Sequence, residues 1–299
     1  DFIVGLGGGS PIDAAKAIAV MATNPGDYWD YMVRGTGGGR PVSVTPLPVV
    51  AITTTAGTGT EMDPWTVITH ETAQEKIGFG CQLTFPTLSI VDPELMVSIP
   101  PHLTAYQGFD AFFHAAEGFI ANCATPISDL YALEAIRLIY KYLPVAVADG
   151  KNLKARAKIA WASTLAGMVE ATSSCTSEHS LEHAMSAYYP QLPHGAGLIA
   201  LSEAYFETFR HDCTKRYMKM AEMMTQKKSN RPSDFIDALI TLQKECKVHS
   251  IKLSEFGIQS EDFPKFLQNA RDTMGGLFTL DPRPITDEEI LHIFKKSYK

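Results

Sequence analysis

This sequence has few cysteines, no net positive charge and no long apolar runs. Its 299 residues include only five cysteines, which are scattered and form no CxxC pair: Cys81, Cys123, Cys175, Cys213 and Cys246. We expect them to be reduced thiols rather than disulfides or metal ligands, which favours a reducing, cytoplasmic compartment. No apolar stretch of about 18 residues predicts a membrane span, and we expect no signal peptide and no membrane partner.

The charge balance is acidic. A net charge of −7 argues against a nucleic-acid partner, which would require a basic patch. The remaining composition, with 45% hydrophobic and 20% charged residues, is that of an ordinary folded enzyme and shows no sign of disorder. A chain of this length suits two domains and can bury a substantial core.

The apolar pattern changes near residue 100. Before it, short apolar runs at 2–6, 49–52 and 88–91 alternate with turns rich in glycine and proline. After it, helical periodicity dominates, with helices expected at 105–121, 128–142, 152–170, 179–188, 197–210, 215–225, 232–246 and 261–270. A last helix follows a capping box formed by Thr286 and Glu289. We therefore expect an α/β domain over 1–101 and an all-helical domain over 102–299.

Two paired motifs in the helical part suggest a metal site. Asp110 and His114 are four residues apart, so on a helix both side chains emerge from one face, and His179 and His183 repeat this spacing. His194 follows, in what we expect to be a loop. One carboxylate with several imidazoles suits Zn(II) or Fe(II) rather than Ca(II) or Mg(II), which prefer oxygen ligands. The simpler alternative is a chance gathering of histidines on amphipathic helices.

Two loops that could bind phosphate come before these motifs. The apolar run 2–6 leads into the glycine turn 7–10 and then into a helix opened by Pro11. Glycines let the backbone approach a phosphate closely, and the N-terminus of a helix favours an anion. A second apolar run leads into 53–61, where five hydroxyls and two glycines could serve a pyrophosphate or a ribose. Either loop could instead be a packing turn that bonds its own backbone.

Taken in order, these segments resemble the iron-containing (group III) alcohol dehydrogenases. The similarity runs along almost the whole chain and is carried by 7–16, 53–61, 90–95, 104–117 and 179–195. The resemblance implies a dehydroquinate-synthase-like fold of the α/β plus all-α class, in which a Rossmann-like dinucleotide-binding domain precedes a helical metal-binding domain. It also implies an NAD(P)-linked oxidoreductase that transfers a hydride between NAD or NADP and a small primary alcohol or diol, reversibly giving the aldehyde.

The resemblance also assigns roles to residues. It implies four ligands for Fe(II) or Zn(II): Asp110, His114, His179 and His194. His183, one turn beyond His179, would line the same cleft and relay a proton. It implies seven cofactor contacts along the pyrophosphate, the ribose and the nicotinamide ribose: Gly8, Gly9, Ser10, Thr54, Thr55, Thr58 and Lys76.

Some features depart from the family pattern. Gln107 stands where a threonine is usual, Thr60 replaces a serine, and the interval from His179 to His194 is one residue longer. We expect the extra residue to be absorbed in the loop at 188–192. The glycine turn follows Asp1 closely, so we expect the first strands of the dinucleotide domain to be absent, together with the residue that selects NAD or NADP. Strand edges and apolar faces would then be exposed.

The expected mechanism is metal-assisted hydride transfer, in which the cation acidifies the alcohol and His183 or a water chain carries its proton. We expect apolar cleft walls formed by Phe112, Phe113 and Cys175, and a homodimer or higher homo-oligomer. A metal-dependent lyase of the dehydroquinate synthase type is one alternative, but the basic residues it would need lie outside the ligand motifs. A truncated, non-catalytic remnant that cannot bind NAD(P) is the other.

Overall fold

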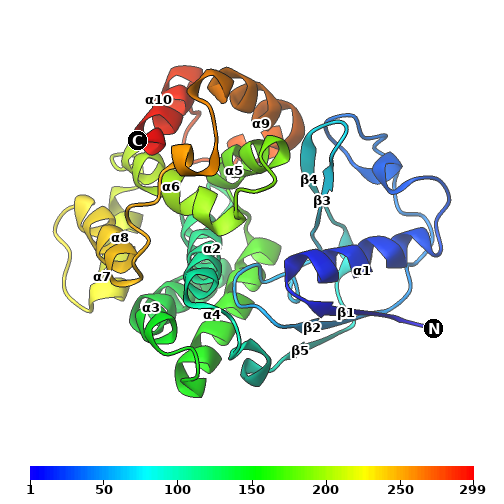
Figure 1. Ribbon diagram of the computed structural model, residues 1–299, viewed down its shortest axis with the longest axis horizontal. Helices are drawn as coiled ribbons and strands as arrows, with labels where there is room; N and C mark the ends of the chain where they lie inside the picture. Colours follow the sequence, from blue (N-terminus) through cyan, green and yellow to red (C-terminus); the bar gives the residue numbers. More distant parts are fainter.

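Strands and long helices occupy different parts of the chain. The computed structural model describes residues 1–299, and its five strands all lie before residue 92. Only one α-helix, α1 (Gly9–Met21), belongs to this first part, and every later element from α2 onward is helical. Figure 1 shows the strands with α1 on one side of the molecule and the remaining helices on the other. The predicted order, an α/β part followed by an all-helical part, is confirmed.

The main sheet has three parallel strands in the order β1 (Ile3–Gly7), β2 (Val49–Thr53), β5 (Leu88–Val91). The apolar runs predicted as strands from the sequence therefore form this sheet, with ends shifted by at most one residue. Helix α1 covers one face, where Ala15 and Ala19 pack against Val49. The turn between β1 and α1 places the N-terminus of α1 at the carboxyl edge of the sheet, the edge at which α/β proteins bind ligands.

The opposite face of this sheet is open. Val4 is in register with Val50, and Val50 with Leu88, so their side chains share that face, as do those of Leu6 and Ile90 in the next row. Val4, Leu6, Leu88 and Ile90 are each between 40% and 60% exposed. The expected exposure of apolar strand surface is observed on this face.

A second, antiparallel sheet was not predicted from the sequence. It consists of β3 (Thr66–His70) and β4 (Glu75–Phe79). The turn between these strands contains neither glycine nor asparagine, and Gln74 takes the left-handed conformation instead, at φ 55°. Residues of β4 pack in a small hydrophobic cluster with Tyr31, the last residue of the short helix η1 (Tyr28–Tyr31). The hairpin extends towards α5 and α9 (Figure 1).

The helical part contains one continuous hydrophobic core. It is formed by α2 (Pro101–Ile120), α3 (Pro126–Ala148), α4 (Leu153–Thr172), α5 (Ser177–Tyr188), α6 (His194–Thr208), α7 (Thr214–Thr225), α8 (Ser233–Glu245), α9 (Phe263–Phe278) and α10 (Asp287–Tyr298). Short 3-10 helices are η2 (Gln82–Thr84), η3 (Pro93–Met96), η4 (Leu253–Phe256) and η5 (Ser260–Asp262). Helix α2 is buried along nearly its whole length from Gly108 onward. No helix is both long and apolar enough to cross a membrane.

Several helix boundaries differ from the prediction. Helix α3 continues through Pro144 to Ala148, because Leu143 and Ala146 are buried and packing outweighs the lost hydrogen bond. Helix α9 continues to Phe278 across a kink at Met274, just before a pair of glycines. Helix α6 begins at His194, so this histidine lies on the first turn of a helix and not in the loop before it. The capping box of Thr286 and Glu289 is confirmed at the start of α10.

A pair of glycines joins the two parts of the fold. Gly59, in the loop after β2, has φ +64°, a conformation that glycine adopts without strain. A Cβ added at Gly59 would lie 2.5 Å from the backbone nitrogen of Gly167 on α4. Any side chain at either position would push the loop and the helix apart.

Candidate metal centre and cofactor cleft

One carboxylate oxygen of the predicted metal site lies near a nitrogen of each predicted histidine ligand. Oδ1 of Asp110 lies 3.4 Å from Nε2 of His194 and 3.6 Å from Nε2 of His179. The same oxygen lies 3.6 Å from Nδ1 of His114, one turn along α2. In a tetrahedral zinc site with ligand distances of about 2.0–2.2 Å, neighbouring ligand atoms are about 3.3–3.6 Å apart. The structure therefore brings one nitrogen of each predicted histidine ligand to a separation from the predicted carboxylate ligand that suits such a site.

Most of the inward-facing atoms of this cluster have no hydrogen-bond partner. Oδ1 of Asp110, Nδ1 of His114 and Nε2 of His179 are all buried and unpaired. Burying unpaired polar atoms costs free energy, so a native structure normally compensates them. A divalent cation bound by one oxygen and three imidazole nitrogens would do so, and this donor set suits Zn(II) or Fe(II).

Each of the three histidines also meets a carboxylate with its other nitrogen. Nδ1 of His179 contacts Oε1 of Glu117, and Nδ1 of His194 contacts Oε2 of Glu182. Nε2 of His114 lies 3.0 Å from Oε1 of Glu170. A carboxylate on the outer nitrogen favours an N–H there, which leaves the lone pair of the other nitrogen pointing inward.

These three carboxylates were not predicted from the sequence as partners of the histidines. Glu117 lies three residues after His114 on α2, and Glu182 lies three residues after His179 on α5. That spacing puts both on the same helix faces as the metal-site side chains, a signal that could have found them. Glu170 comes from α4, and no local pattern links it to His114.

The pKa shifts follow from burial and from these contacts. Burial favours the neutral acid, yet His114 and His194 hold the pKa of Asp110 well below its ordinary value. Burial lowers the pKa of His114 to about 3. Burial alone would also lower the pKa of His179, but Cys175 and Glu117 raise it well above its usual value. The cluster therefore combines an ionised carboxylate with an imidazole that remains neutral.

His183 lies beside this cluster and not within it. Its ring centroid lies 5.4 Å from that of His194, and it lines the cleft. Its Nδ1 is buried without a partner. Burial lowers the pKa of His183 well below its ordinary value, so the side chain is a neutral imidazole near neutral pH.

The glycine turn and the threonine loop meet at the same cleft. The cleft has a volume of about 330 Å³, and it is lined by Gly9, Ser10, Thr58, Lys76 and all of the predicted metal-site side chains. A Cβ on Gly9 would lie 2.8 Å from Cγ2 of Thr58, so glycine is needed for the two loops to touch.

The remaining predicted cofactor residues do not line this cavity. Gly8 packs on Thr55, whose Cγ2 would lie 2.9 Å from an added Cβ, and the backbone N–H of Thr54 donates to the carbonyl of Gly7 over 2.8 Å. The hydroxyl of Thr53 donates to the carbonyl of Thr55, which is the self-bonded turn considered above as the alternative. Part of the threonine loop thus stabilises its own backbone.

One lysine of the α/β part lines the cleft, and a second is buried within the α/β part. Lys76, on β4, donates to Oγ of Ser186 over 2.9 Å and to Oε2 of Glu182 over 3.2 Å. Lys16, on α1, is fully buried, and it donates to Oγ1 of Thr60 and pairs with Asp63 at 3.2 Å. The sequence analysis did not recognise the Lys16 network, which ties α1 to the threonine loop.

The prediction of apolar walls is wrong. Phe112 and Phe113 are fully buried and pack against Phe235 and Phe206 in the helical core. Phe112 follows Asp110 by two residues, which places it across the helix from the metal-site side chains. Beside the histidines, the cleft is lined by polar groups and by a few apolar ones: Asp63, Glu170, Ser174, Cys175, Trp65, Val67, Met274 and Leu277.

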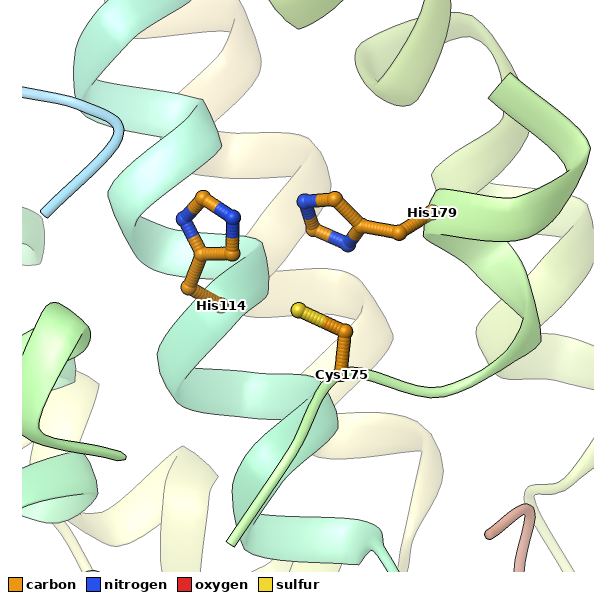
Figure 2. Close-up of side chains that lie close together, drawn as sticks. All are labelled: His114, Cys175 and His179. Atoms are coloured by element: carbon orange, nitrogen blue, oxygen red, sulfur yellow. The ribbon is translucent and has the colours of Figure 1, made fainter. Parts of the chain in front are cut away.

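Cys175 does line the cleft as expected, and it lies close to two of the histidines. Its Sγ lies within 4.8 Å of ligand nitrogens of His114 and His179. Figure 2 shows the sulfur pointing towards both rings from the segment that precedes α5. All five cysteines are free thiols in this structure.

Comparison with known proteins identifies the family. Residues 1–93 match the profile described as iron-containing alcohol dehydrogenase, and residues 104–298 match that of the Fe-containing alcohol dehydrogenase family, C-terminal. The chain belongs to the iron-containing alcohol dehydrogenase family. Its enzyme class is therefore that of an alcohol dehydrogenase, an oxidoreductase, and the predicted family, fold and enzyme class are confirmed.

Similar members of the family are named as dehydrogenases of alcohols. The chain is 35% identical to an NAD-dependent methanol dehydrogenase of Bacillus methanolicus, over 99% of this chain and 77% of that protein. It is 34% identical to a 1,3-propanediol dehydrogenase of Citrobacter freundii, over 100% of this chain and 76% of that protein. An archaeal halo-thermophilic alcohol dehydrogenase from a Red Sea brine pool superposes with a TM-score of 0.94 at 35% identity, over 99% of this chain and 77% of that one.

Proposed function

We propose that Asp110, His114, His179 and His194 hold one divalent cation, Fe(II) or Zn(II), at which a small primary alcohol or diol is oxidised with NAD(P) or the aldehyde is reduced. The observation that carries this proposal is the convergence of three histidine nitrogens on Oδ1 of Asp110 at 3.4–3.6 Å. The unpaired, buried state of most of these atoms supports a cation as their common partner.

We propose the division of labour predicted from the sequence, with 1–101 as the dinucleotide-binding domain and 102–299 as the metal-binding domain. Gly9 and Ser10 begin α1, where free backbone N–H groups and the helix dipole favour the cofactor pyrophosphate. Gly8, Thr54, Thr55 and Thr58 would complete the phosphate and ribose contacts. Lys76 lies at the cleft beside the histidines and would serve the nicotinamide ribose. NAD is supported by the methanol dehydrogenase relative; NADP is the other cofactor to test.

A small alcohol or diol fits the lining of the cleft. The propanediol dehydrogenase relative supports a diol, and Glu170 and Ser174 offer hydrogen-bond partners for a second hydroxyl beside the histidines. The apolar side chains Met274 and Leu277 would contact the carbon chain.

When bound, the cation supplies Lewis acidity to the substrate oxygen, and the nicotinamide supplies the redox chemistry. The chain supplies positioning and a proton path. Glu117 and Glu182 hold the imidazoles of His179 and His194 with their lone pairs turned towards Asp110, and Glu170 lies 3.0 Å from the outer nitrogen of His114. His183, neutral because burial lowers its pKa, would accept the hydroxyl proton directly or through a water and pass it towards solvent.

One experiment tests this function and its alternatives together. Metal content is measured by mass spectrometry, and aldehyde reduction is followed by the loss of NADH or NADPH absorbance. We expect about one cation per chain and turnover with short aldehydes. Stoichiometric metal without any binding of NAD(P)H, measured by fluorescence titration, would indicate the non-catalytic remnant instead.

A lyase of the dehydroquinate synthase type finds less support. It would need several basic side chains around the metal for an anionic carbocyclic substrate. Between Asp110 and His194 none of the lysines and arginines lines the cleft, and Arg156 instead donates to the carbonyls of Gly150 and Ile99. We also propose a cytoplasmic location, which the five free thiols support, and a homodimer or higher homo-oligomer, for which size-exclusion chromatography with light scattering is the test.

A further inference from the structure

We propose that Cys175 is an additional ligand in this cleft and that its sulfur makes the site selective for a thiophilic cation such as Zn(II). The inference deepens the proposed function, on which it rests, by adding a soft donor to the four expected from the sequence. It departs from the interpretation of all five cysteines as thiols without a metal role.

The geometry that carries the inference is the group formed by Cys175, His114 and His179. Their ligand atoms lie within 4.8 Å of one another, and Figure 2 shows all three side chains converging. The three residues come from the segment before α5, from α2 and from α5, so no single turn of helix accounts for their meeting. An ion with one sulfur ligand at about 2.3 Å and nitrogens at about 2.0–2.1 Å would need neighbouring ligand atoms roughly 3.0–3.6 Å apart. Coordination would therefore draw these side chains closer together than the 4.8 Å within which they lie.

The two histidines supply an observation independent of the thiol. Nδ1 of His114 and Nε2 of His179 are buried and have no hydrogen-bond partner. Cys175 is itself only 8% exposed, and that exposed part faces the cleft. A cation bound between the two rings would satisfy both nitrogens and would lie on the side of the cleft that Cys175 lines.

The chemistry of the sulfur determines which cation benefits. Thiolates favour Zn(II) over harder ions, whereas a site of carboxylate and imidazole can hold either Fe(II) or Zn(II). Coordination forms one metal–sulfur bond and breaks the S–H bond, and the released proton leaves through the cleft to solvent. No electron is transferred, so the step needs no oxidant or reductant. Cys175 would thus shift the preference of this cleft from Fe(II) towards Zn(II).

Cobalt(II) substitution tests the sulfur directly. The full chain is freed of metal with a chelator and titrated with Co(II), and a near-ultraviolet thiolate-to-Co(II) charge-transfer band is recorded. The variants are Cys175→Ala, Cys175→Ser and Cys213→Ala. Cys213 is a matched control, because it is equally buried and lies outside the cleft. Circular dichroism confirms folding of each variant.

We expect the band in the wild type and in Cys213→Ala, and its complete loss in both variants of Cys175, with one Co(II) still bound. In competition with a chelator, the affinity for Zn(II) should fall on the order of 10- to 100-fold in these variants, a range already reached by removing a partner of a ligand. The affinity for Fe(II) should change less. In the wild type, Zn(II) should also abolish alkylation of Cys175 by a small thiol reagent, a result that needs no variant.

Other outcomes overturn the proposal at different levels. Stoichiometric Co(II) binding without the band, or a band that survives in Cys175→Ala, excludes the sulfur as a ligand and leaves the four-ligand site intact. Failure of the wild type to bind Co(II) at all overturns the metal site of the proposed function, and this inference with it.

Discussion

The ammonium group of Lys76 lies 3.2 Å from Oε2 of Glu182, and the same carboxylate oxygen contacts Nδ1 of His194. A side chain of the α/β part is therefore connected to a metal-site histidine of the helical part through one buried acid. The connection means that Glu182 serves two partners, and its removal should affect both halves of the cleft.

Replacing Glu182 by glutamine should weaken metal binding. The amide cannot balance the charge of Lys76 and holds the ring of His194 less strongly, so the cation affinity should fall on the order of 10- to 100-fold. Titration of the metal-free protein with Zn(II) measures this change. Glu203→Gln, at an exposed position of α6, is the control and should bind as the wild type does. Equal affinities for the two variants would refute the orienting role.

Replacing His114 by alanine should empty the metal site. The variant removes one of the three nitrogens that converge on Asp110, and it leaves the buried carboxylate with fewer partners. Metal content after dialysis is the measurement. His102→Ala, at an exposed position near the start of the same helix, should retain the metal. Full occupancy of His114→Ala at unchanged affinity would show that the ligand set is wrong.

Replacing His183 by alanine should separate turnover from metal binding. Because His183 lies outside the contacts around Asp110, the variant should keep its cation and lose activity by roughly 10²- to 10⁴-fold, the usual contribution of a positioned proton acceptor. The dependence of kcat on pH should also change shape. Loss of metal as severe as that in His179→Ala would instead make His183 a ligand.

Replacing Gly9 by alanine should weaken cofactor binding through a defined clash. The new Cβ would lie 2.8 Å from Cγ2 of Thr58. Thr58→Ser deletes that methyl group and keeps the hydroxyl, so the double variant should recover much of the affinity for NAD(H). Gly9→Asp should not be rescued in this way, because its charge also repels the pyrophosphate. Metal content should remain normal in all three, and an unchanged cofactor KM in Gly9→Asp would rule out the glycine turn as the phosphate site.

Replacing Asp281 by asparagine should reduce the dependence of stability on pH. Burial raises the pKa of Asp281 to about 7 from its ordinary value of 3.8, although Oδ1 accepts hydrogen bonds from Ser177 and Tyr205. Between these values the folded chain holds a proton that the unfolded chain has lost, so this acid favours folding most at low pH. Its contribution falls as pH rises through this window, by up to about 1.4 kcal/mol per pH unit.

Urea unfolding of the wild type and of Asp281→Asn at several pH values between the two pKa values measures this contribution. Taking the difference between the two proteins removes the effects of the other titrating groups. Parallel stability curves would show that Asp281 is ionised in the folded state throughout.

Much of the fold followed from periodicity, because it reflects which side of each element is buried. The three apolar runs became the parallel sheet, and the paired spacings of Asp110 with His114 and of His179 with His183 fell on helices α2 and α5. The hairpin β3–β4 was not predicted, because its turn depends on Gln74 in a conformation that is uncommon for that residue. Because the hairpin was not predicted, the position of Lys76 beside the histidines could not be derived from the sequence.

The parts of the site that sequence could not predict are contacts between distant elements. Glu170 reaches His114 from α4, and no spacing in the sequence links these two residues. Cys175 was expected at the cleft, but its approach to His114 depends on how the segment before α5 packs against α2. The assignment of Phe112 to the cleft failed for a related reason, because closeness to Asp110 in sequence places a residue two positions on across the helix.

The backbones of Gly59 and Gly167 are in direct contact, with no side chain between them. The threonine loop that is proposed to contact the cofactor and the helix that carries Glu170 touch backbone to backbone at this point, so neither can move closer. Hydride transfer requires the reacting atoms to approach to about 3–3.5 Å, and a misplacement of about 1 Å, such as a methyl group inserted here would cause, can lower the rate roughly 10²-fold. The distance between the proposed cofactor site and the proposed metal site therefore depends on the absence of a side chain at Gly59 and Gly167.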